Sequence, residues 1–146
     1  MRLDKFTTKF QEALAEAQSL AVGRDHQFIE PVHIVYCLLT QQGGTVAPLL
    51  RQCNVPIDQL QQALQAKLDQ LPSIQGHGGD IHISNDSARL LNLADKAAQE
   101  RNDAYISSEL FILAALADKG ILGELLRQYG LNKQALSAAI AKPSTM

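Results

Sequence analysis

The chain has 146 residues, a formal net charge of −2 and 46% hydrophobic residues, which are the proportions of one folded globular domain and not of a disordered chain. No window concentrates Lys and Arg, as nucleic-acid binding would require, and no apolar run is long enough for a signal peptide or a membrane span. We therefore expect a cytoplasmic domain that binds neither nucleic acid nor membranes, with its two cysteines, Cys37 and Cys53, reduced and packed.

The first half of the chain predicts four helices. Apolar residues recur at three- and four-residue spacings, and cap and stop residues bracket the periodic segments. Proline suits the first turn of a helix, because its missing N–H would have no partner there. The expected helices run from Thr7 or Thr8 to Gly23, from Pro31 to the Gly43-Gly44 pair, from Thr45 through Cys53, and over a leucine stripe that stops before Pro72.

The second half predicts the same plan. Its expected helices run from Ser84 to about Arg101, from Ser107 or Ser108 onward, between Gly120 and Gly130, and from Asn132 to before Pro143. Between the halves, a segment with Gly76, Gly78 and Gly79 is expected to be a linker. Strand-like alternation occurs only around Ile81-His82-Ile83, which is too short to found a sheet.

The two halves are copies of one unit. Shifted by 77 positions, residues 28–39 fall on residues 105–116 with apolar character kept at most helical positions. After the next loop the shift becomes 76, and Leu-Leu-Arg-Gln at 49–52 falls on the same four residues at 125–128. We expect an all-α fold in which two four-helix repeats pack with pseudo-twofold symmetry and leave a groove at their junction. The single domain, 1–146, then divides into repeat one (1–71), a linker (72–83) and repeat two (84–142).

No motif for catalysis is present in the sequence. The phosphate-binding pattern G-x-x-x-x-G-K-[ST] is missing, so we expect no ATP hydrolysis and no cofactor in this chain. His33 and Cys37 are one helical turn apart, and His77 and His82 flank the glycine-rich segment. Each pair falls short of the three or four ligands of a zinc site, so we expect neither a metal site nor an enzyme.

Four segments carry a resemblance to a known family: MRLDKFTTKFQEALAEAQSLA, QFIEPVHIVYCLL, the GGD that ends at Asp80, and NDAYISSELFILAAL. Together they resemble, over nearly the entire chain, the N-terminal domain of ClpB-type members of the Hsp100/Clp family. The resemblance implies a substrate-recognition domain of an ATP-dependent disaggregase chaperone of the heat-shock stress response. By this resemblance, the domain is expected to bind exposed apolar segments of unfolded or aggregated proteins and to pass them to an AAA+ pore.

The same resemblance implies partners that lie outside this chain. They are the protein's own homohexameric AAA+ ring, which uses ATP, and the chaperones of the DnaK system. The chain stops before any nucleotide module of such a protein would begin, and we expect the isolated domain to be monomeric. Two alternatives stay open: the adaptor-docking N-domain of a Clp protease ATPase subunit, which shares the repeat, and an interaction protein unconnected to any motor.

Two leucines are candidates for contact with client proteins. Leu93 corresponds to Glu16 in the first repeat, and Leu110 corresponds to His33. A position that is apolar in one copy and polar in the other is not demanded by the shared core, so we predict that both leucines line one apolar groove. The competing interpretation is that one or both only fill the seam between the repeats.

Three polar residues complete the predicted substrate-binding set. Thr7, Asp103 and Glu109 match family positions that are associated with substrate handling. One hydroxyl and two carboxylates beside an apolar groove could orient a peptide by hydrogen bonds or attract basic residues. Alternatively, Thr7 only caps its helix, and Glu109 only favours a helix N-terminus.

Overall fold

The computed structural model describes residues 3–74 and 81–141 of the chain, which are mostly helical. After a short 3-10 helix, η1 (Leu3–Lys5), the helices are α1 (Thr8–Gly23), α2 (Pro31–Thr40), α3 (Val46–Gln52), α4 (Ile57–Gln70), α5 (Asn85–Glu100), α6 (Ser108–Ala117), α7 (Ile121–Gln128) and α8 (Lys133–Ala141). Each predicted helix is present, which confirms the all-α fold class. The three glycines of the expected linker lie outside the described residues.

Polar side chains cap the helices at most of the starts that the sequence singled out. At each of these starts a side-chain oxygen accepts the backbone N–H three residues later, which satisfies a donor that has no partner within the helix. The pairs are Thr7 with Phe10, Ser84 with Ser87, Ser107 with Leu110, and Asn132 with Ala135. Thr45, at the start of α3, makes no such capping bond with its side chain.

Matched hydrogen bonds show the pseudo-twofold relation between the repeats. The backbone N–H of Thr7 donates to the carbonyl of Ile106 at 3.0 Å. Seventy-seven positions later, the N–H of Ser84 donates to the carbonyl of Ile29 at 3.1 Å. Each bond joins the start of one repeat's first helix to the segment before the other repeat's second helix, so the repeats exchange equivalent contacts.

The turns that end the first helix of each repeat are also equivalent. Asp25 and Asn102 both adopt a φ of 59°, the left-handed conformation that asparagine and aspartate tolerate best among residues with a side chain. The residue after each turn then donates its N–H back into the helix at 2.9 Å, from His26 to Ala21 and from Asp103 to Ala98. The same turn therefore precedes α2 and α6, although the sequences differ.

Two short strands pair where the segment before α2 meets the segment before α5. Strand β1 (Phe28–Ile29) pairs in parallel with β2 (His82–Ile83), with Phe28 opposite His82 and Ile29 opposite Ile83. The equivalent place in the other half holds a single parallel bridge between Phe6 and Ile106. The residues around Ile81-His82-Ile83 thus form only a two-residue strand, as their shortness predicted.

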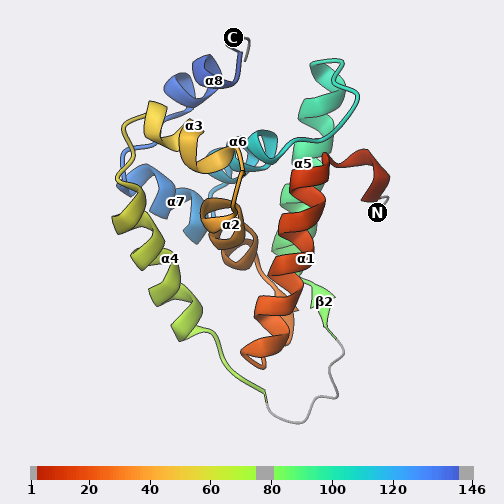
Figure 1. Cartoon of the computed structure of the whole chain (residues 1–146), viewed down its shortest axis with the longest axis vertical. Coiled ribbons are helices and arrows are strands. Elements are labelled where there is room, and N and C mark those ends of the chain that lie inside the picture. Colours follow the sequence, from red (N-terminus) through yellow and green to blue (C-terminus); the bar gives the residue numbers. More distant parts are fainter. Residues whose placement is uncertain (1–2, 75–80, 142–146) are drawn as a thin grey trace.

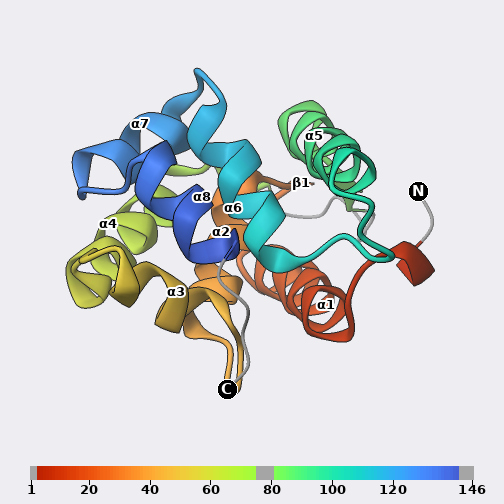
Figure 2. The ribbon, with the colours of Figure 1, turned by 90° about the horizontal axis from the view of Figure 1, so that it is seen from above.

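Helices α2 and α6 occupy the middle of the domain, with α1 and α5 on one side and α3, α4, α7 and α8 on the other (Figures 1 and 2). Most residues of the two central helices are buried, which explains why their sequences are apolar on every face. The Phe10 ring of α1 lies 5.5 Å from the Phe111 ring of α6. One continuous core therefore spans both repeats.

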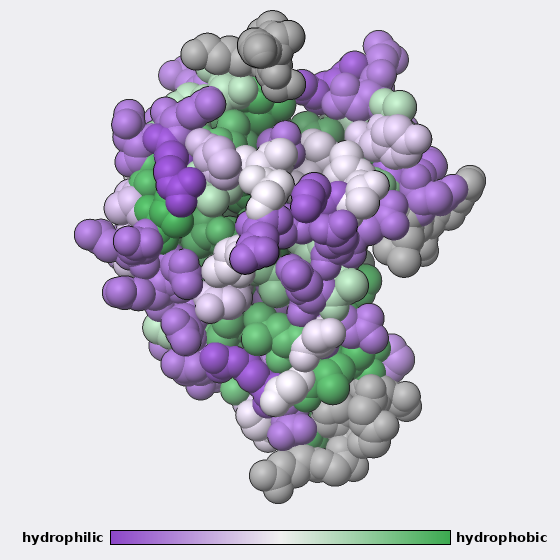
Figure 3. Space-filling view, in the orientation of Figure 1, coloured by the Kyte–Doolittle hydropathy of each residue, from purple (hydrophilic) through white to green (hydrophobic). Residues whose placement is uncertain are grey.

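The surface is mixed in character. Figure 3 shows polar side chains over most of the face seen in Figure 1, with apolar side chains gathered in separate areas, one of them near the lower end of α1. None of the described helices combines the length and apolar character that crossing a membrane would take. A functional surface has to be sought at hollows and at individual exposed apolar residues.

Candidate functional site

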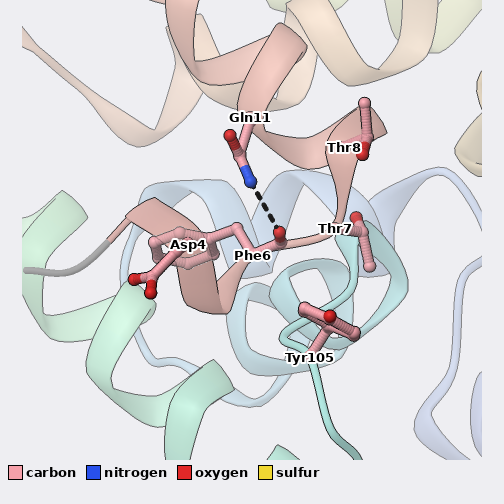
Figure 4. Close-up of a pocket in the computed structure, with 6 residues that line it drawn as sticks. All are labelled: Asp4, Phe6, Thr7, Thr8, Gln11 and Tyr105. Carbon is pink, nitrogen blue, oxygen red and sulfur yellow. Dashed lines mark hydrogen bonds between the residues drawn. The ribbon is translucent and has the colours of Figure 1, made fainter.

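A hollow of about 590 Å³ lies where the start of α1 meets the loop before α6. Figure 4 shows its lining residues: Asp4, Phe6, Thr7, Thr8 and Gln11 from repeat one, and Tyr105 from repeat two. The Gln11 amide donates to the carbonyl of Phe6 at 2.9 Å, which holds the segment before α1 against the helix. Tyr105 is 57% exposed and presents an aromatic ring at the edge of the hollow. We call this hollow the Thr7 hollow.

Thr7 performs a structural task and also lines this hollow. Its hydroxyl oxygen accepts the N–H of Phe10 at 3.2 Å as the N-cap of α1, and its own N–H donates to Ile106. The side chain remains partly exposed. The capping role expected for Thr7 is confirmed, and its proposed contact with clients stays a prediction.

Leu93 is exposed, as the comparison of the repeats predicts. Its side chain is 41% exposed, whereas Leu90, Leu91 and Ala94 on the same helix are buried in the core. Leu93 does not line the Thr7 hollow. It offers apolar area to a partner from the middle of α5.

The prediction that Leu110 lines an accessible groove is wrong. Leu110 is 1% exposed and belongs to the core cluster that spans both repeats, as the competing interpretation, that it fills the seam between the repeats, requires. Its counterpart His33 is fully buried as well. The inference failed because a polar residue can occupy a core position when its hydrogen bonds are satisfied there.

Asp103 lies in the turn after α5 and is exposed. Its carboxylate accepts a hydrogen bond from Arg101 Nε at 3.1 Å, and both side chains face solvent. Exposed pairs of this kind add little stability. The carboxylate is therefore accessible to a partner, three residues before the Ile106 carbonyl that binds Thr7.

Glu109 lies in the first turn of α6 and joins the two repeats. Its carboxylate accepts a hydrogen bond of 2.9 Å from the hydroxyl of Thr45, at the start of α3. The position also suits a negative charge, because backbone N–H groups point out of a helix N-terminus. Glu109 thus has a structural role beyond the one expected, and only part of its side chain is exposed.

A second hollow, of about 500 Å³, shares no lining residue with the Thr7 hollow. It lies at the seam between repeats, where the start of α2 and the end of α4 meet α5 and α7, and we call it the seam hollow. Its lining includes Glu30, Val32, Leu71, Arg89, Asp118 and Ile121. In place of one continuous groove at the junction, the structure therefore has two hollows with different lining residues.

An ion-pair network borders the seam hollow. Arg89 donates to Asp118 at 2.9 Å and to Asp86 at 2.7 Å. The hydrogen bond from Arg89 is the main cause that lowers the pKa of Asp118. Arg89 and Asp118 are 29 positions apart, so no local pattern in the sequence could have indicated this pairing.

His33 and Cys37, whose spacing would suit two metal ligands, are both buried in the core. His33 is buried against His26, with His26 Nδ1 and His33 Nε2 at 2.8 Å. Burial raises the pKa of the Cys37 thiol to about 12, which keeps it protonated. Within residues 3–74 and 81–141, no group of three or more His, Cys, Asp or Glu residues is placed to hold a metal ion. His77 lies outside these ranges.

Comparisons with known proteins agree with this architecture of two helical repeats. The family described as the Clp repeat N-terminal domain matches residues 5–129. Chaperone protein ClpB of Vibrio cholerae is 54% identical over 142 residues, which cover 97% of this chain and 17% of that protein. Chaperone protein ClpB of Pseudomonas putida is 53% identical over 140 residues, covering 96% of this chain and 16% of its own length.

Solved structures share the fold at lower identity. The Hsp104 N-terminal domain of Candida albicans superposes with a TM-score of 0.81 at 20% identity, covering 94% of this chain and 90% of that one. The N-terminal domain of the ClpV1 ATPase of E. coli has a TM-score of 0.82 at 23% identity, with coverages of 99% and 93%. The chain belongs to the Clp repeat N-terminal domain family, and it spans about a sixth of the length of the ClpB proteins it matches.

Proposed function

We propose that this domain recognises clients for a ClpB-type disaggregase by binding exposed apolar segments of unfolded or aggregated polypeptides. Membership of the Clp repeat family and the high identity to ClpB chaperones support the proposal. The structural observation that carries it is the exposure of Leu93 and Tyr105, two large side chains that the core does not use. Large apolar side chains that are exposed in this way can be buried against apolar side chains of a client.

Thr7, Tyr105 and Asp103 provide polar groups that could hold a peptide at the Thr7 hollow. Thr7 and Tyr105 line one hollow, and the exposed Asp103 carboxylate lies in the same loop as Tyr105. A hydroxyl and a carboxylate can bond to the backbone of an extended chain or attract its basic residues. Binding through a few such contacts is weak and tolerant of sequence, as a domain serving many clients requires.

The rest of the machine follows from the family and is also a proposal. The domain would deliver clients to the pore of its own homohexameric AAA+ ring, assisted by DnaK-system chaperones in the cytoplasm. ATP would be bound and hydrolysed by modules outside this chain. The domain itself would need no cofactor and would catalyse no reaction.

The alternative is a domain that docks one adaptor protein. In a solved complex of similar fold, at 24% identity and a TM-score of 0.78, the ClpV N-domain carries a VipB peptide. A docking domain would bind one defined partner, whereas a client-binding domain binds many unfolded chains weakly. The two functions therefore differ in the breadth of binding.

A titration followed by amide NMR tests the proposal. The probes are two unrelated, permanently unfolded proteins, for example reduced and carboxymethylated lactalbumin and casein, with folded lactalbumin as the control. We expect both unfolded chains to shift the amides of Thr7, Leu93 and Tyr105, and the folded control to shift none. Absence of shifts with both unfolded chains would contradict client recognition by this domain.

A further inference from the structure

Two imidazoles face each other inside repeat one. His26 lies in the turn after α1 and His33 in the first turn of α2, with exposed fractions of 3% and 0%. His26 Nδ1 and His33 Nε2 are 2.8 Å apart, which is hydrogen-bond distance. Neither group has a counterpart in repeat two, where Asp103 and Leu110 stand at these positions.

The neighbouring backbone fixes where the protons are. The N–H of Glu30 donates to His33 Nδ1 at 2.8 Å, so this nitrogen must be an acceptor. In a neutral imidazole the proton is then on Nε2, which donates it to His26 Nδ1. Both histidines are therefore neutral, and each has its proton at Nε2.

A further proton has no place in this arrangement. On His33 Nδ1 it would confront the N–H of Glu30, and on His26 Nδ1 it would confront the N–H of His33. Either encounter replaces a hydrogen bond by two opposed donors inside the core. A proton on His26 Nδ1 breaks the bond that ties the end of α1 to the start of α2. A proton on His33 Nδ1 breaks the bond from the Glu30 N–H instead, because His33 Nε2 can still donate to His26.

The charged groups around the pair do not relieve the conflict. Arg24, at the end of α1, disfavours a positive charge on either ring, and Asp25 favours one on His26. Arg24 is itself paired with Asp69 of α4 at 2.7 Å. On the side of α5, Asp86 and Arg89 line the seam hollow together with Glu30.

We propose that the His26–His33 pair is a proton-operated latch: a proton taken up on His26 Nδ1 breaks the bond between the two rings and releases the first turn of α2 from the end of α1. The released segment contains Glu30, Pro31 and Val32, which line the seam hollow. Acidification therefore loosens the wall of that hollow while α6, the equivalent helix, keeps its contacts. The latch is independent of client binding at the Thr7 hollow.

The direction of the pH effect follows from proton linkage. Burial is the main cause that lowers the pKa of both rings, to about 4 for His33. The ordinary pKa of histidine is about 6.5, so the unfolded chain binds more protons than the folded one below that pH. The contribution of the pair to stability is therefore fully present above about pH 6.5 and is lost as the pH falls towards about 4.

Chemical denaturation between pH 7.5 and 4.5 tests the energetic part. The double variant His26→Asn with His33→Gln keeps an uncharged hydrogen-bonded pair, and glutamine at this helix position can still accept the Glu30 N–H. His82→Gln, at an exposed histidine, is the matched control. We expect the unfolding constant of the wild type and control to rise about tenfold per pH unit for each proton taken up by the unfolded chain. The double variant should lack the rise in unfolding constant that His26 and His33 cause. An equal rise of the unfolding constant in all three proteins would overturn the latch.

An NMR titration of the wild type tests the structural part and needs no variant. At pH 7.5 we expect His33 Nδ1 to have the ¹⁵N shift of an unprotonated nitrogen. On acidification the unprotonated ¹⁵N signal of His26 Nδ1 should disappear over the same pH range in which the Glu30 amide moves, while the amide of Ser107, the equivalent of Glu30 in repeat two, does not move. A protonated Nδ1 at pH 7.5, or equal movement of Glu30 and Ser107, would overturn the proposal.

Discussion

The hydroxyl of Thr45 donates a hydrogen bond of 2.9 Å to the carboxylate of Glu109, which fastens the start of α3 to the start of α6. This contact crosses between the repeats, 64 positions apart in the chain. It gives Glu109 a structural task that exists without any client. A role of Glu109 in recognition has to be measured separately from this task.

The first prediction separates the two roles of Glu109. Thr45→Ala removes the hydrogen bond and leaves the carboxylate in place, so it should cost about 0.5 to 1.5 kcal/mol of unfolding free energy and leave client affinity unchanged. Glu109→Ala should cost a similar amount and also weaken the binding of an unfolded protein. Denaturant titration and fluorescence anisotropy give the two quantities. Equal affinities of the two variants would mean that Glu109 is only structural.

The second prediction concerns Leu110 as a core residue. Because Leu110 is buried in the first turn of α6, Leu110→Ala should lower the free energy of unfolding by about 2 to 5 kcal/mol. Leu110→Met, which nearly keeps the volume, should cost less than about 1.5 kcal/mol. Denaturant titration measures both. A loss below 1 kcal/mol for the alanine variant would contradict the burial of this side chain.

The burial of His33 shows which features of the structure the sequence could predict and which it could not. Helix bounds and caps were predictable, because periodicity and N-cap side chains such as Ser84 act within a few residues. The comparison of repeats was right for Leu93, whose counterpart Glu16 is exposed. It was wrong for Leu110, because its counterpart His33 is buried with a partner from another segment.

The seam hollow shows the same limit. Its walls come from α2, α4, α5 and α7, and the pair Arg89–Asp118 joins residues that no spacing rule connects. Only the three-dimensional packing brings these groups together. Contacts between distant segments were predictable here only where the internal repeat supplied them, as for the general arrangement of the two units.

The third prediction tests Leu93 as a contact residue. Leu93→Asn should change the unfolding free energy by no more than about 0.5 kcal/mol, since the side chain is largely outside the core. It should weaken the binding of an unfolded protein about three- to tenfold, equivalent to roughly 0.7 to 1.4 kcal/mol. The matched control is Val22→Asn on α1, because Val22 is 42% exposed. Equal loss of affinity in both variants would argue for general surface stickiness.

The fourth prediction concerns thiol reactivity. Burial is the main cause that raises the pKa of both Cys37 and Cys53, and the thiolate is the reactive form. In the native domain at pH 8, both thiols should therefore react slowly with iodoacetamide, and they should react rapidly in denaturant. Mass spectrometry of timed samples measures the two rates. Rapid labelling of Cys37 in the native domain would show that α2 opens readily.

The fifth prediction asks whether Thr7 does more than cap α1. Thr7→Ala and Ser84→Ala remove equivalent caps, each the acceptor for an N–H three residues later, so each should cost about 1 kcal/mol of stability. Thr7 lines the Thr7 hollow and Ser84 does not, so only Thr7→Ala should weaken client binding. Thr7→Ser, which keeps the hydroxyl, should bind clients as the wild type does. Denaturant titration and anisotropy are measured on all three variants. Should Ser84→Ala weaken binding as much as Thr7→Ala, lost helix stability would explain both, and the hydroxyl of Thr7 would have no direct contact with the client.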